Sequence, residues 1–258
     1  MTLLATDIIE KFYAFLWPML RISALMMVAP IFSLSAFNLR LRILLALALT
    51  WLVYPLHPWP ALDPASAEGL AQIFNQIAIG AVMGLILQIA IASMVVAGQS
   101  IAASMGLSMA NMMDPNMGNV PVVSQLFIVM ASLIFVSFGG HAILLGLISE
   151  SFRVVPVGES VLQPALYARL INWSSMLFLG ALLMALPVMA SLLFINIGMG
   201  VVTRAAPSLN IFAVGFPAMI MAGFLLLIMS TESIGARMEW IWLQGFNVIR
   251  DMLGIPNG

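Results

Sequence analysis

The side chains that could carry acid–base or metal chemistry are few in this sequence and lie far apart. The two histidines, His57 and His141, belong to separate segments, and Glu150 and Glu159 flank a polar stretch that contains Arg153. Two carboxylates can share general acid–base work, but an ordinary loop at a membrane surface is the favoured interpretation of this stretch. The sequence has no cysteine, no H-E-x-x-H helix and no phosphate-binding loop. It therefore predicts no catalysis, no metal site and no cofactor.

Three charged residues inside or beside apolar segments are more informative than these scattered groups. They are Arg21, Arg204 and Glu232. Ionisable groups in hydrocarbon are costly and often functional. For Arg21 and Glu232 the favoured interpretation is that the side chain reaches the lipid headgroups or forms one internal ion pair. Arg204 differs because it opens a longer motif.

The composition predicts an integral membrane protein. Hydrophobic residues make up 63% of the 258 residues and charged residues only 7%, whereas soluble domains carry about 25% charged residues. Most of the charge-free runs reach or approach the roughly 20 residues that a spanning helix needs: Ile22–Leu39, Ile43–Leu62, Gly69–Met113, Pro115–Ser149, Leu170–Thr203 and Ala205–Thr231. A net charge of −1 without a basic patch gives no indication of nucleic-acid binding.

The elements that must position any site are helices, and we expect an all-α fold in one domain, residues 1–258. Six kinked hydrophobic regions are predicted at about Asp7–Val28, Leu39–Val53, Gly69–Ser104, Val122–Ser149, Leu170–Gly200 and Phe212–Ser233. Pro187 and Pro217 fall inside the last two and should kink them. An amphipathic helix should follow, with its apolar stripe on the membrane surface or against a partner. Its stripe comprises Ile234, Met238, Ile241, Gly245, Val248 and Met252.

The third region is about twice as long as a hydrocarbon core of roughly 30 Å requires. Gln88 and Gln99 lie on nearly one face of it, and two interpretations stay open: hydrogen bonding between helices, or a wall facing a water-filled lumen. Gly80 and Gly84 form a G-x-x-x-G pair that would let another helix approach closely.

The segment "SMGLSMANMMDPNMGNVP", Ser104–Pro121, interrupts the apolar pattern at the centre of the chain. Its methionines have flexible, polarisable side chains that pack against irregular shapes. A compliant seal and an ordinary connection between helices both fit these residues.

Three segments, in this order, resemble the FliR family of flagellar export-gate proteins, called SctT in injectisomes. The first is "APIFSLSAFNLRLRILLALAL" (Ala29–Leu49), with a P-x-F turn before an arginine-bearing helix start. The second is "GQSIAASMGLSMANMMDPNMG" (Gly98–Gly118), which is similar to the central family segment ending in D-P. The third and most specific is "RAAPSLNIFAVGFP" (Arg204–Pro217), which resembles R-x-x-P-x-x-N-x-F-x-x-G-F-P.

The resemblance implies a structural and gating subunit of the flagellar type III export gate in the bacterial inner membrane, at the flagellar basal body. It implies a FliP-like N-terminal part, a FliQ-like C-terminal part, and assembly with FliP and FliQ around a pore for unfolded flagellar proteins. FlhB and FlhA are further expected partners, with FlhB a candidate for contact with the C-terminal helix. No catalytic residue is expected.

The same resemblance implies roles for two sets of residues. The central loop would act as a pore plug, through Met105, Gly106, Met109, Met112, Met113, Asp114, Pro115, Met117 and Gly118. The third motif would serve assembly, through Arg204, Pro207, Asn210, Phe212, Gly215, Phe216 and Pro217. The main alternative function is a secondary transporter or channel for a small solute. Such a protein usually has related halves and clustered intramembrane charges, neither of which is evident here.

Overall fold

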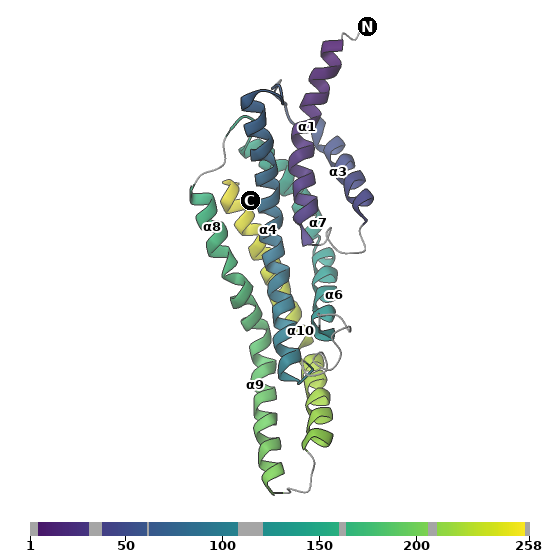
Figure 1. The fold of residues 1–258 in the computed structure, drawn as a ribbon, viewed down its shortest axis with the longest axis vertical. Coiled ribbons are helices and arrows are strands. Elements are labelled where there is room, and N and C mark those ends of the chain that lie inside the picture. The colour runs from purple at the N-terminus through teal and green to yellow at the C-terminus, as the bar shows by residue number, and fades with distance from the viewer. Residues whose placement is uncertain are drawn as a thin grey trace. The chain divides into compact units, whose positions relative to one another are not determined.

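The computed structural model describes residues 5–30, 38–60, 62–107, 121–159, 164–205 and 211–255. Every regular element in these ranges is helical (Figure 1), which confirms the predicted all-α class. The elements are α1 (Ala5–Val28), α3 (Leu39–Val53), the 3-10 turn η1 (Tyr54–Leu56), α4 (Ala67–Ser104), α6 (Val122–Ser137), α7 (Gly140–Val154), α8 (Pro164–Ser174), α9 (Met176–Ala205) and α10 (Ile211–Leu253). Five helical segments of this part are long and apolar enough to span a membrane, or six if α6 and α7 count as one broken span.

Helices α1, α3 and α4 agree with the predicted bounds to within two residues. Local capping explains two of the starts. The Asn38 side chain accepts from the Arg40 N–H in α3, and the Ser66 hydroxyl accepts from the Gly69 N–H at 2.9 Å at the start of α4. The 38 residues of α4 correspond to about 57 Å at 1.5 Å per residue, so the third region is as long as predicted.

The fourth predicted region is wrong as a single helix, because the chain breaks between α6 and α7. Gly139 adopts φ 75°, in the left-handed region that glycine reaches without strain. Its carbonyl oxygen then accepts from the N–H groups of Ala142 and Ile143 and starts α7. A break therefore divides the apolar run at a glycine pair.

The sixth region and the amphipathic tail are also wrong as separate elements. Helix α10 runs unbroken through 43 residues. Ile234, Met238 and Ile241, which we expected on a membrane surface or a partner, are buried within this chain. Helices α9 and α10 both continue past their internal prolines, Pro187 and Pro217.

The chain packs into two compact units. Unit 1 comprises Met1–Ile89, Gly139–Ser174 and Gln244–Gly258, and unit 2 comprises Ala90–Phe138 and Ser175–Leu243. Each unit thus combines segments that are distant in the sequence.

In unit 1, glycines bring α1 and α4 into close contact. A Cβ atom on Gly80 would overlap the backbone carbonyl oxygen of Arg21, and one on Gly84 would lie 2.7 Å from the Cβ of Val28. The G-x-x-x-G pair therefore lies where two helix backbones approach too closely for any larger residue.

In unit 2, close packing and hydrogen bonds join α4 and α10 to α6. A Cβ atom on Gly98 would lie 2.7 Å from the Cα of Ser124, whose hydroxyl donates to the Val95 carbonyl oxygen at 3.0 Å. The Trp242 indole N–H donates to the Ala131 carbonyl oxygen at 3.2 Å. These bonds satisfy polar groups in an otherwise apolar core.

Candidate functional site

The predicted plug loop begins at the C-terminus of α4, in unit 2. Met105 and Gly106 belong to the described part of the chain. Leu107 donates its N–H to the Ala102 carbonyl oxygen at 3.0 Å, and Gly106 has φ 84°. This six-residue closure around a left-handed glycine ends the helix as a Schellman motif. Gly106 therefore sets the direction in which the central segment leaves α4.

The structure brings this helix end against residues of the third motif. A Cβ atom on Gly106 would lie 2.9 Å from Cε1 of Phe216. Met105 is fully buried, and a Cβ atom on Gly223 would lie 2.5 Å from its Cγ. Two of the three sequence motifs thus meet in unit 2, with Gly215 and Phe216 opposite the base of the central loop.

A cavity of about 340 Å³ lies at this junction. Its lining is Ala103, Ser104, Met105, Gly106, Asn196, Met199, Gly215, Phe216 and Met219. A second cavity of about 380 Å³ shares Ser104 and Asn196 with it and extends along α9. The three methionines give the first cavity adaptable apolar walls.

Asn196, Met199 and Met219 were missed by the sequence reasoning. Asn196 had a signal, because it is a lone amide within the long apolar run of α9 and such groups mark polar contacts inside membranes. The two methionines had none, since the chain carries 21 methionines and only the fold shows which of them share a cavity.

The other predicted residues of the plug and the third motif are placed as follows. Outside the described residues lie Met109, Met112, Met113, Asp114, Pro115, Met117, Gly118, Pro207 and Asn210. Phe212 is described only as part of α10, and Pro217 is exposed on that helix. Arg204 is exposed in the last turn of α9.

Arg21 forms a second polar centre, in unit 1, and differs from both predicted forms. It is buried with 1% exposure, so it does not reach toward headgroups. Its Nε donates to Oε1 of Gln76 at 2.8 Å, Nη1 to Oγ of Ser151 at 2.9 Å and Nη2 to the Val155 carbonyl oxygen at 3.0 Å. The guanidinium carbon lies 4.1 Å from the centre of the Phe152 ring. Neutral acceptors and an aromatic face thus hold this cation, in place of the expected carboxylate.

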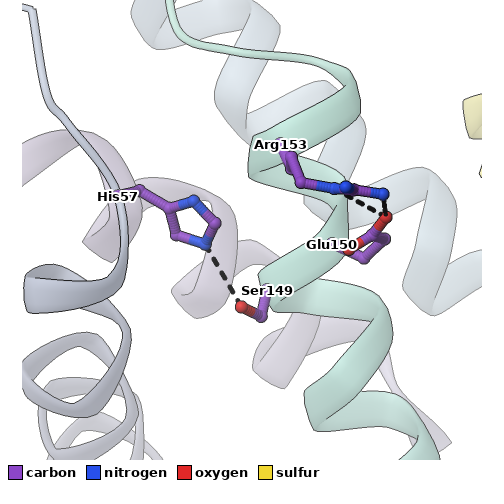
Figure 2. Close-up of polar contacts among 4 residues, drawn as sticks. All are labelled: His57, Ser149, Glu150 and Arg153. Atoms are coloured by element: carbon purple, nitrogen blue, oxygen red, sulfur yellow. Dashed lines mark hydrogen bonds and ion pairs between the residues drawn. The ribbon is translucent and has the colours of Figure 1, made fainter.

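The turn after α3 packs beside this centre. Trp59 contacts the Phe152 ring edge-on at 5.1 Å between ring centres and stacks on Tyr54 at 6.3 Å. The His57 ring points toward α7, where its Nε2 lies 3.2 Å from Oγ of Ser149 (Figure 2). Partial burial, with the positive charge of Arg21 as a smaller contribution, lowers the pKa of His57 below its usual value of 6.5.

The residue after Ser149, Glu150, forms an ion pair with Arg153, which lies one turn further along α7 (Figure 2). Both residues of this ion pair lie on α7, where a polar loop was expected. Within the described ranges, no three acidic or histidine side chains come close enough together to bind a metal ion.

Comparison with known proteins finds a matching family and several relatives. Residues 12–244 match the family described as "Bacterial export proteins, family 1". The chain is 33% identical to flagellar biosynthetic protein FliR of Pectobacterium carotovorum subsp. carotovorum over 248 residues, which cover 96% of this chain and 95% of the relative. It is 33% identical to that of Escherichia coli K12 over 240 residues (93% and 92%) and 30% identical to that of Bacillus subtilis 168 over 253 residues (96% and 98%). With the motifs and the membrane-spanning helices, these similarities show that the chain belongs to the FliR family of bacterial export proteins.

Proposed function

We propose that this chain is a structural and gating subunit of a flagellar type III protein export gate in the bacterial inner membrane. With FliP and FliQ it forms the pore through which unfolded flagellar proteins pass. The observation that carries the proposal is the similarity over nearly the whole chain to proteins named for flagellar biosynthesis. The part played by FliP and FliQ follows from what the FliR resemblance implies.

The apolar surface supports a role inside a larger assembly. Helix α9 has 30 residues and α10 has 43, which correspond to about 45 Å and 65 Å, against a hydrocarbon core of about 30 Å. Phe178, Phe194 and Ile228 on these helices are 73%, 75% and 72% exposed. Apolar side chains beyond the reach of lipid need protein neighbours, and FliP and FliQ would supply them.

The cavity at the base of the central loop supports a gating role. Flexible methionine side chains can close around different shapes, and an apolar constriction excludes water and ions by dewetting. The Schellman turn at Gly106 would fix where the plug loop leaves α4. The loop residues named above would form the plug, and the motif from Arg204 to Pro217 would serve assembly. The proposed role requires positioning and sealing and no catalytic group on this chain.

Co-purification tests the assembly. The full-length chain, co-expressed with FliP and FliQ from the same genome, should be isolated in one stable complex, and Arg204→Ala should reduce that yield more than it reduces membrane insertion. Arg40→Ala, another exposed arginine at a helix end, is the matched control. A well-behaved monomer that ignores both proteins would refute the assembly and favour a small-solute transporter. FlhB and FlhA would be tested in the same way.

Ion leakage tests the seal. In the assembled complex, replacing Gly106–Asn119 with a glycine–serine segment of equal length should raise ion flux across the membrane. Gly146→Ala, on α7 with open space around the added Cβ atom, controls for the general effect of a substitution. Unchanged flux in an intact complex would exclude the plug.

A further inference from the structure

A cleft in unit 1 is lined by charged and apolar residues that have no part in the proposed export role. It lies between the last turns of α8 and the end of α10, and its volume is about 690 Å³. Arg169, Asn172 and Asp251 form its polar rim, and Trp173, Val248 and Ile255 form its apolar wall. A site of this size with apolar walls and a few polar groups is typical of small-ligand pockets.

The rim offers one positive and one negative charge, and the two side chains do not form an ion pair with each other. The Arg169 guanidinium donates to the backbone carbonyl oxygen of Asp251, an acceptor left open by the helix end. Within the described residues the Asp251 carboxylate makes no ion pair. Arg169 and Asp251 both line the cleft, so a guanidinium and a carboxylate are available at one rim.

The walls of the cleft are held in place. The Trp173 indole N–H donates to the Ile86 carbonyl oxygen at 3.0 Å, so the ring is fixed in the wall. Gly254 has φ 75°, and the Ile255 N–H donates to the Arg250 carbonyl oxygen at 2.9 Å, which ends α10 in a Schellman motif. The cleft is thus a preformed feature of two helix ends.

The cleft lies where two long apolar helices end. One candidate span begins at Ala168 and another ends at Leu253, the residues next to the two charged rim positions. Tryptophan and arginine are enriched at the depth of lipid headgroups. A ligand with polar and apolar parts is available in quantity at that depth.

We propose that this cleft binds a phospholipid whose headgroup carries both a phosphate and a primary ammonium group, as phosphatidylethanolamine does. The phosphate accepts hydrogen bonds from the Arg169 fork, whose planar donors suit phosphate oxygens. The ammonium group donates to the Asp251 carboxylate, beside a helix C-terminus that also favours a positive charge. Trp173, Val248 and Ile255 contact the glycerol and the first acyl carbons. This site is independent of the proposed export function.

Native mass spectrometry of the full-length chain tests the proposal directly. The chain, together with any subunits that co-purify with it, is reconstituted into vesicles of equal parts phosphatidylethanolamine and phosphatidylglycerol and extracted again in mild detergent, and the bound lipids are counted. The wild type should retain about ten times more phosphatidylethanolamine than phosphatidylglycerol, which corresponds to a difference of about 1.4 kcal/mol in binding free energy. Phosphatidylcholine, whose quaternary ammonium cannot donate, should compete less well than phosphatidylethanolamine in a second vesicle mixture.

Two variants distinguish the charges. Asp251→Asn removes the ammonium acceptor and leaves the backbone carbonyl oxygen in place, so the preference should shift toward phosphatidylglycerol. Arg169→Gln should lose both lipids. Arg169→Lys keeps the positive charge and should retain binding, which would show that the glutamine variant loses the lipids through its lost charge and not through misfolding. Glu239→Gln and Arg237→Gln, on the same helix outside the cleft, should keep the wild-type ratio. A wild-type preference for phosphatidylglycerol, or an unchanged ratio in Asp251→Asn, would overturn the proposal.

Discussion

Replacing Arg21 with methionine removes the guanidinium from the centre of unit 1 and leaves a long, unbranched side chain in its place. Three hydrogen bonds from the charged group are lost, to Gln76, Ser151 and Val155. At about 1.5–3 kcal/mol for each bond that involves a charge, the loss is roughly 5–9 kcal/mol. The variant also avoids burying an ion, which recovers several kcal/mol. We therefore expect Arg21→Met to lower the free energy of unfolding by about 2–4 kcal/mol.

Arg21→Lys should be less stable than Arg21→Met, although it keeps the charge. A lysine ammonium is a point charge, and it cannot reach three acceptors that the planar arginine fork satisfies from α4 and α7. The lysine variant therefore retains the desolvation penalty and loses most of the compensation. This ordering separates the geometry of the guanidinium from its charge.

The assay heats native membranes and follows the fraction of detergent-soluble chain by immunoblot. For a chain of this size a loss of 1 kcal/mol lowers the unfolding temperature by about 2–4 °C, so Arg21→Met should lower it by about 5–15 °C. Arg40→Met and Arg40→Lys, at an exposed arginine, should lie within about 2 °C of the wild type. A lysine variant as stable as the wild type, or a methionine variant more stable than it, would refute the reasoning.

Three further predictions use the same assay. Gly80→Leu and Gly84→Val should prevent α1 from packing on α4 and greatly reduce the amount of folded chain. Gly198→Ala, at a helical site with open space, should be neutral or stabilising by up to about 1 kcal/mol. Equal stability of the three variants would exclude the close approach of α1 and α4. Gly106→Ala should destabilise by about 1–2 kcal/mol because φ is 84°, and a wild-type unfolding temperature would show that this backbone geometry is not needed. Because the pKa of His57 is lowered in the folded chain, the unfolded chain binds a proton at this residue at a higher pH than the folded chain does. The free energy of unfolding should therefore fall slightly as the pH drops below about 6.5. His57→Gln should lose that part of the pH dependence, and an unchanged pH dependence in this variant would assign it to other groups.

The length of the apolar runs and the prolines between them were sufficient to predict α1, α3 and α4. The break at Gly139 was not predictable in the same way, because a glycine pair inside a long apolar run can also be accommodated within a helix. The end predicted near Ser233 was wrong because polar residues such as Glu232 change the hydrophobic pattern of α10 without breaking its backbone.

The candidate sites, like the helices, could be predicted only in part. The central segment and the third motif could be identified from their residues, but their meeting at Gly106 and Phe216 depends on the packing of α4 against α10. For Arg21 both expected forms, a side chain that reaches the headgroups and an internal ion pair, were wrong, since its acceptors are a buried amide, a hydroxyl and a backbone carbonyl. Such neutral groups occur throughout any sequence, and only the fold shows which of them converge.

The break before α7 has a consequence for what surrounds it. The first N–H groups of a helix lack partners within it, and Gly139 at the start of α7 has no side chain to supply one. If α6 and α7 together form one broken span, these donors lie where acyl chains could accept no hydrogen bond, at a penalty of several kcal/mol each. The His141 side chain, exposed beside these N–H groups, would be a further polar group without a hydrogen-bond partner in the acyl chains. We therefore expect the first N–H groups of α7 to bind water or to be covered by a neighbouring subunit, and fast deuterium exchange at the amides of Gly140 and His141 would indicate water.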